Sequence, residues 1–134
     1  MNNTIPADWA FHSELNSLCT KISAGIEKYW TIQGFTHGRA PKVDVTSVGA
    51  RYIKLGSFED RNGKYDCNSV YCFIDKNNGD VLKGSWKAPV KNGVRGNLKD
   101  ADILSKCGVY GLQYLKGDNQ RLSTNYITIA HLLK

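Results

Sequence analysis

The chain has 134 residues, of which 41% are hydrophobic, 22% charged and 10% aromatic, and its net charge is +6. This length and composition predict a single globular domain over residues 1–134 and exclude a disordered chain, a collagen-like chain and a coiled coil. No apolar stretch reaches the ~20 residues that a membrane-spanning helix needs. The N-terminus lacks a basic region followed by an apolar one, so we expect no secretory signal and a basic intracellular protein.

The clearest local pattern is a long amphipathic helix, predicted from Ala7 to about Gln33. Apolar residues recur there at steps of three and four, the period of one helical face: Phe11, Leu15, Leu18, Ile22, Ile26 and Tyr29. Gly34 is expected to end the helix. Gly25 lies inside the helix, where glycine costs about 1 kcal/mol relative to alanine. Gly25 either marks a close crossing between this helix and another element or is tolerated without a specific role.

The middle of the chain has the pattern of a small antiparallel sheet over residues 43–84. Alternating apolar residues bounded by glycines indicate the first two strands, and a segment apolar on both faces indicates a central third strand. Glu59–Lys64 is predicted to be a loop with an Asn-Gly turn, and residues 75–80 a hairpin turn, because Asn-Gly tolerates positive φ. The predicted strands are Val43–Val48, Arg51–Phe58, Val70–Ile74 and Val81–Lys83.

The C-terminal third is less regular. Residues 97–107 suit a short helix with Asn97 or Asp100 as its cap and Gly108 after its end. Tyr126–Leu133 is apolar enough for a strand or a helix, and periodicity does not decide between them. The expected fold class is therefore α+β: a long N-terminal helix packed on a small antiparallel sheet, then a short C-terminal helix and a terminal element.

The residue types that commonly bind metals or act in catalysis are scattered along the chain and form no recognisable motif. Cys67 and Cys72 are the closest cysteines, with four residues between them, whereas structural zinc sites usually use closer pairs. We expect reduced cysteines, with Cys19 and Cys72 acting as small apolar residues. The phosphate-loop, dinucleotide-binding and hydrolase motifs do not occur. Of the histidines, only His37, in a glycine-flanked loop, is a candidate for a functional role that is worth testing. We expect no enzyme, no cofactor and no metal.

The positive charge is concentrated between Lys83 and Lys99. This basic segment holds five cations and no acid, and the cations recur at every fourth residue: Lys83, Lys87, Lys91, Arg95 and Lys99. Pro89, Gly93 and Gly96 argue against a helix, so we expect an extended, glycine-hinged loop that leaves the hairpin. Free backbone N–H groups beside lysine and arginine suit phosphate binding.

Trp86 stands in the middle of the basic segment. An aromatic ring flanked by cations can stack on a base while the cations meet phosphates, which is worth ~1 to 3 kcal/mol per base. Tyr52, Tyr71 and Phe73 would extend such a platform if their strand face is uncovered. The alternative is that Trp86 caps the core and the lysines are solvated. The chain lacks the helix-turn-helix, RNP and zinc-finger signatures of sequence-specific readers.

The hairpin and the basic segment resemble a group of small uncharacterised tailed-bacteriophage proteins. The residues that carry the resemblance are F-I-D-K-N-N-G-D-V-L-K at 73–83, S-W-K-A-P at 85–89 and R-G-N at 95–97. They lie within a stretch of about 25 residues, 73–97, which is under a fifth of the chain. The resemblance implies a phage origin, a location in the cytoplasm of an infected bacterial host, and a hairpin and basic segment that form one structural unit. It implies no catalytic residue.

The leading hypothesis is a non-enzymatic phage accessory protein that binds nucleic acid with low sequence specificity. The expected site residues are Lys83, Trp86, Lys87, Lys91, Arg95 and Lys99. One alternative is an oligomeric sponge that sequesters a nucleotide signal of host defence, with Trp86 stacking on the base. Another is a virion component or a protein that binds a host protein, in which the lysines meet an acidic surface. None of these hypotheses involves a membrane.

Overall fold

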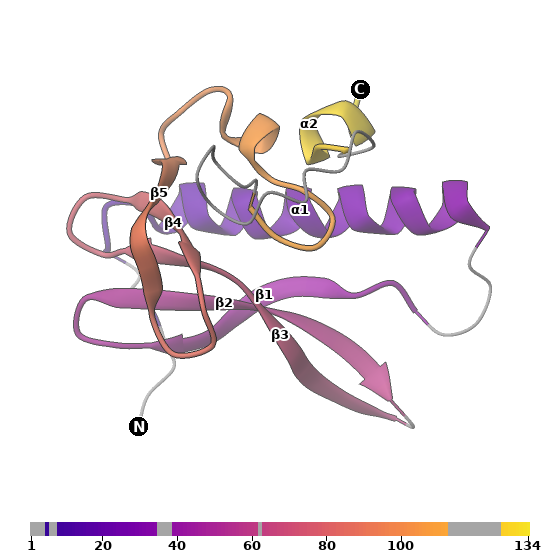
Figure 1. Ribbon diagram of the computed structural model, residues 1–134, viewed down its shortest axis with the longest axis horizontal. Coiled ribbons are helices and arrows are strands. Elements are labelled where there is room, and N and C mark those ends of the chain that lie inside the picture. Colours follow the sequence, from indigo (N-terminus) through magenta and orange to yellow (C-terminus); the bar gives the residue numbers. More distant parts are fainter. Residues whose placement is uncertain (1–4, 6–7, 35–38, 62, 113–126) are drawn as a thin grey trace.

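The computed structural model describes residues 5, 8–34, 39–61, 63–112 and 127–134. Over these residues a long helix lies along one side of a five-stranded antiparallel sheet, and short helical turns follow the sheet (Figure 1). The predicted α+β class is confirmed. The elements are α1 (His12–Gln33), β1 (Lys42–Val48), β2 (Tyr52–Arg61), β3 (Lys64–Asp75), β4 (Asp80–Gly84), β5 (Pro89–Asn97), the 3-10 helix η1 (Ile103–Lys106) and α2 (Ile129–Leu132).

Helix α1 follows the predicted apolar stripe but begins at His12, later than the predicted Ala7. Trp9, which lies before the helix, is instead held against the β3–β4 turn, since its indole Nε1 donates to the Lys76 carbonyl at 3.0 Å. The buried residues of the stripe are Leu15, Leu18, Ile22 and Ile26. Gly34 ends the helix in the left-handed conformation (φ 74°), as predicted.

The sheet is a meander in which each strand pairs with the next, and β3 is its central strand as predicted. The predicted loop over Glu59–Lys64 is wrong. Strand β2 continues to Arg61 and β3 starts at Lys64, and these two residues pair with each other. The hairpin therefore needs only a two-residue connection, which matches the Asn-Gly turn signal but places it at the tip of a longer arm. Asn62 lies outside the described residues.

The predicted glycine-hinged loop after the hairpin is also wrong, because most of the basic segment forms β5. This strand pairs with β4, with Leu82 opposite Val94 and Asp80 opposite Asn97. Pro89 is tolerated because it is the first residue of a strand at the edge of the described sheet. Gly93 allows β5 to approach β4 closely, since a Cβ there would lie 2.8 Å from the Lys83 carbonyl oxygen. Charge and glycine content suggested a loop, but pairing with β4 decided the structure.

The sheet has an inner face that packs on α1 and an outer face that does not. The inner face contributes fully buried apolar side chains to the core with α1: Ile53, Leu55, Cys72, Ile74 and Val81. Tyr71 joins them because a shift in register between β2 and β3 leaves it as an extra residue beside Cys72. Its hydroxyl donates to the Gly108 carbonyl at 2.6 Å. This contact ties the chain after β5 to the sheet.

The C-terminal elements close the core over α1. The helix predicted over residues 97–107 is reduced to η1, and Ile103 is its buried residue. The terminal element, left undecided by its sequence, is the short helix α2; its N-terminus is capped by Thr128, whose hydroxyl accepts from the backbone N–H of His131. Ile129 packs on α1 at Gly25, where an added Cβ would lie 2.9 Å from two of its carbons. Gly25 thus marks a close crossing.

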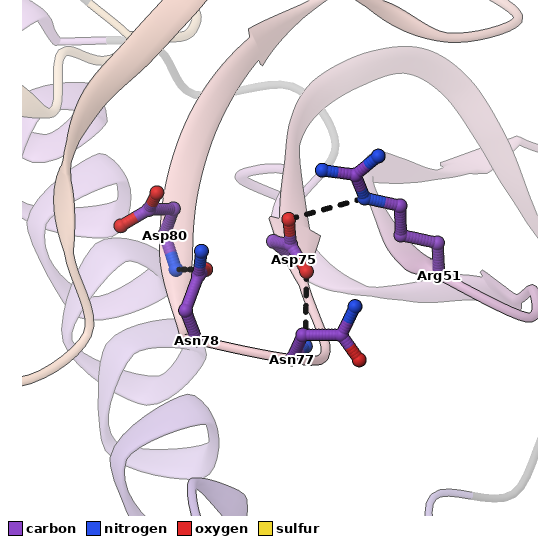
Figure 2. Close-up of polar contacts among 5 residues, drawn as sticks. All are labelled: Arg51, Asp75, Asn77, Asn78 and Asp80. Carbon is purple, nitrogen blue, oxygen red and sulfur yellow. Dashed lines mark hydrogen bonds and ion pairs between the residues drawn. The ribbon is translucent and has the colours of Figure 1, made fainter.

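The turn between β3 and β4 is fixed by side chains that bond to the backbone (Figure 2). Asp75 accepts from the backbone N–H of Asn77, and Asn78 accepts from that of Asp80, both at 2.9 Å. Gly79 has the positive φ (80°) expected of this Asn-Gly turn. Asp75 is buried and also accepts from Arg51 at 3.3 Å. The polar residues of this turn therefore have structural partners.

Within the described ranges, no helix combines the length and the apolar character needed to cross a membrane.

Candidate nucleic-acid interface

Trp86 lies in the tight turn that joins β4 to β5. Ser85 closes this turn, because both its backbone N–H and its hydroxyl donate to the Ala88 carbonyl, at 2.8 and 3.0 Å. The Trp86 side chain is 57% exposed. It therefore does not cap the core, which was one of the two expectations for this residue. An exposed indole on a braced turn is available to a ligand.

Lys54 of β2 is the partner of Trp86. Its Nζ lies 4.2 Å from the centre of the indole ring, a cation–π contact that orients the ring against the sheet. Lys54 belongs to the outer face, since it alternates with the buried Ile53 and Leu55. Sequence analysis missed Lys54. The alternation places it on the outer face, but its contact with a turn 32 residues later depends on how β4 and β5 bend over β2.

The five cations predicted to meet phosphates do not lie together. Lys87 in the turn and Lys91 at the adjoining end of β5 are exposed. Neither forms a hydrogen bond or an ion pair with any described residue, which leaves both ammonium groups available. Lys83 is half-buried, and its Nζ donates to the Leu112 carbonyl at 3.3 Å. Lys83 thus links β4 to the chain after η1 through this hydrogen bond.

Arg95 and Lys99 also have structural roles. Arg95 is 6% exposed, and its Nη1 donates to the Asn92 carbonyl at 3.0 Å. Asn92 has a positive φ of 55°, so this bond braces an unusual backbone conformation in β5. Lys99 forms an ion pair with Glu14 at 2.9 Å, and its Nζ lies 5.4 Å from the centre of the Phe11 ring. Arg95 is too buried to reach a phosphate, and Lys99 joins the chain after β5 to α1.

The expected aromatic platform of Tyr52, Tyr71 and Phe73 is mostly buried. Tyr71 and Phe73 are buried at 3% and 4% exposure, so the condition that their face is uncovered is not met. Phe73 packs over Gly84, where even one added carbon would collide with its ring. Tyr52 is half-buried on the outer face, in edge contact with Phe73. The guanidinium of Arg51 lies 5.1 Å from the centre of the Tyr52 ring.

Among the residues that the structure describes, the other titratable groups form no competing site. Within the described ranges, no three side chains among His, Cys, Asp and Glu are grouped to hold a metal ion. Burial raises the pKa of the Cys19 and Cys107 thiols to about 12 and that of Cys72 well above its usual value, so these thiols stay protonated. Cys67 is half-buried between Thr46 and the Ser69 carbonyl. His37 lies outside the described residues.

The exposed candidate site is therefore small. It consists of Trp86 and three lysines contributed by β2, the turn and β5: Lys54, Lys87 and Lys91. It contains an aromatic ring with one cation against its face, and two further cations close along the chain. This set can bind an anion that also carries a flat ring, but it holds no nucleophile or acid–base pair.

Comparison with known proteins places the chain in a family. Residues 10–111 match the family of unknown function DUF7717. The match covers more than half of the chain and includes all elements from α1 through η1. No curated protein and no solved structure matches the chain. The chain belongs to the family of unknown function DUF7717.

Proposed function

We propose that this member of DUF7717 is a non-enzymatic protein that binds nucleic acid with little sequence preference. The binding site is the exposed turn between β4 and β5 together with the adjoining lysines. In this proposal Lys87 and Lys91 meet phosphates, and Trp86 contacts a base. The observation that carries the proposal is the exposed indole held against the Lys54 ammonium at 4.2 Å, beside two lysines whose charges are not neutralised by described residues.

The charge of the chain supports a polyanionic partner. Its net charge is +6, and a basic protein attracts nucleic acid at long range. Lysines that contact phosphates release counterions, so such binding weakens as salt rises. In this proposal the affinity comes from phosphate contact and stacking, both of which tolerate any sequence.

The setting of this function is a further part of the proposal. The likeness of the hairpin and basic segment to small tailed-phage proteins supports an accessory role in the cytoplasm of an infected bacterium. A virion component would use the same lysines on an acidic protein surface, and an oligomeric sponge would use Trp86 on a host nucleotide. Neither alternative has an observation of its own in its favour.

The test is fluorescence anisotropy of labelled oligonucleotides across a salt series. The parent protein should bind with an affinity that falls linearly on a log–log plot of binding constant against salt concentration. The double variant Lys87→Ala/Lys91→Ala should bind more weakly to every sequence, with a slope smaller by about two, because each lost phosphate contact removes about one unit.

The matched control is Lys21→Ala/Lys28→Ala, which removes the same charge from exposed positions on α1. This variant should keep most of the affinity and the parent slope. If both double variants lose affinity equally, net charge rather than this site is responsible. If the parent protein fails to bind even at low salt, the proposal is refuted. A nucleotide that co-purifies with the protein would then favour the sponge.

A further inference from the structure

We infer that the nucleic acid taken by this site is single-stranded and that one unpaired base stacks on the exposed face of Trp86. This inference rests on the proposed function and specifies its substrate class. In a duplex each base is already stacked on its neighbours and paired, so an indole fixed on a protein turn cannot reach the face of a base without opening the helix. A splayed single strand offers that face directly.

The geometry of Trp86 suits stacking on one side. The ammonium of Lys54 lies 4.2 Å from the ring centre, so one face of the indole is in contact with β2. Trp86 is nevertheless 57% exposed, so a large part of its surface can be covered by a ligand. The cation also fixes the orientation of the ring before the ligand arrives, which lowers the entropy that binding must remove.

The outer face of β2 extends the same pattern. Tyr52 lies on the same face as Lys54, two residues before it, and Arg51 lies 5.1 Å from the centre of the Tyr52 ring. The two cation–aromatic contacts are therefore anchored about 7 Å apart along β2. Tyr52 therefore continues the pattern of aromatic and cationic side chains along the same face of β2.

The cations around the candidate site differ in the partners they already have. Asp75 already neutralises Arg51 at 3.3 Å, so Arg51 serves mainly to hold the Tyr52 ring. The net positive charges near Trp86 are those of Lys54, Lys87 and Lys91, which come from three separate elements. Lys54 acts as a positioning residue for the indole and also supplies one cation, whereas Lys87 and Lys91 contribute charge alone.

The experiment compares a labelled single-stranded oligonucleotide with the duplex of the same sequence, using the full chain and anisotropy at fixed low salt. The parent protein should prefer the single strand. Trp86→Leu keeps an apolar side chain but removes the stacking surface. It should weaken single-strand binding roughly 5- to 150-fold, as expected for one stacked base. It should weaken duplex binding much less, and it should leave the salt slope unchanged because no cation is removed.

Two further variants separate stacking from other effects. Tyr65→Leu removes an aromatic ring of similar exposure, 49%, from the β2–β3 arm, and should change neither affinity. Lys54→Met keeps the length of the side chain without its charge. It should weaken single-strand binding more than duplex binding and lower the slope by about one. Thermal unfolding of each variant shows whether it remains folded.

The possible results separate the two proposals. If neither oligonucleotide binds at low salt, the proposed function fails, and this inference fails with it. If single strand and duplex bind equally, or Trp86→Leu weakens both equally, the proposed function stands and this inference is overturned. It is also overturned if an unlabelled mononucleotide displaces the single strand at equal concentration. A preference for single strand that Trp86→Leu removes supports the inference.

Discussion

The contact between Gly25 of α1 and Ile129 of α2 allows the sign of one substitution to be worked out. In Gly25→Ala, the higher helix propensity of alanine favours the folded state by about 1 kcal/mol. The new Cβ, however, would lie 2.9 Å from both Cδ1 and Cγ2 of Ile129, a fully buried residue. Inserting a methyl group into a packed core typically costs about 1–3 kcal/mol.

In Gly25→Ala, the cost of inserting a methyl group into the packed core should exceed the gain in helix propensity. Cδ1 of Ile129 can move by rotation about χ2, but Cγ2 moves only if χ1 changes, which a β-branched side chain in a helix resists, or if the backbone shifts. That backbone is held, since the Ile129 N–H donates to the Cys107 carbonyl at 2.8 Å. We expect a net loss of about 1 kcal/mol, measured by urea unfolding with circular dichroism, and a fall in Tm of about 3–5 °C.

Two variants make this expectation refutable. Ser17→Ala lies on the exposed side of α1 and should leave stability unchanged or raise it by a few tenths of a kcal/mol through helix propensity alone. Ile129→Val removes Cδ1, so the double variant with Gly25→Ala should lose less than the sum of the single variants. If Gly25→Ala instead stabilises the protein by about 1 kcal/mol, the crossing is not tight and the reasoning is wrong.

Three further predictions test structural roles assigned above. Arg95→Met should lower stability by about 1.5–3 kcal/mol, because it removes a buried charged donor, whereas Lys91→Met should stay within about 0.5 kcal/mol; equal losses would contradict the roles assigned to these residues. The hydrogen bond from Lys99 lowers the pKa of Glu14 below 4.5, so this pair stabilises the fold above that pH and the stabilisation is lost as pH falls through the lowered pKa. Lys99→Met should therefore flatten the loss of stability in acid, as followed by urea midpoints, and an unchanged acid limb would refute this. Alkylation at mildly alkaline pH should label Cys67 alone, with the other three cysteines labelled only in denaturant, because the pKa of each of those three thiols is raised; mass spectrometry that finds a second rapid label would contradict this.

The candidate site could be predicted only in part. Trp86, Lys87 and Lys91 were identified because aromatic and cationic residues lie close together along the chain, and the structure leaves all three exposed. Lys83, Arg95 and Lys99 were grouped with them because they share the same spacing. Pairing of β4 with β5 directs these three toward separate structural contacts.

Local patterns in the sequence determined α1, the presence of the first four strands, the Asn-Gly turn between β3 and β4 and the α+β class. These features depend on residues a few positions apart, whose periodicity and turn preferences act within one element. Only the tertiary structure decided that the basic segment is a strand, that Tyr71 is buried and that Lys54 meets Trp86. Each of these depends on strand register or on the bend of one hairpin over another, and both are set by contacts between residues far apart in the chain.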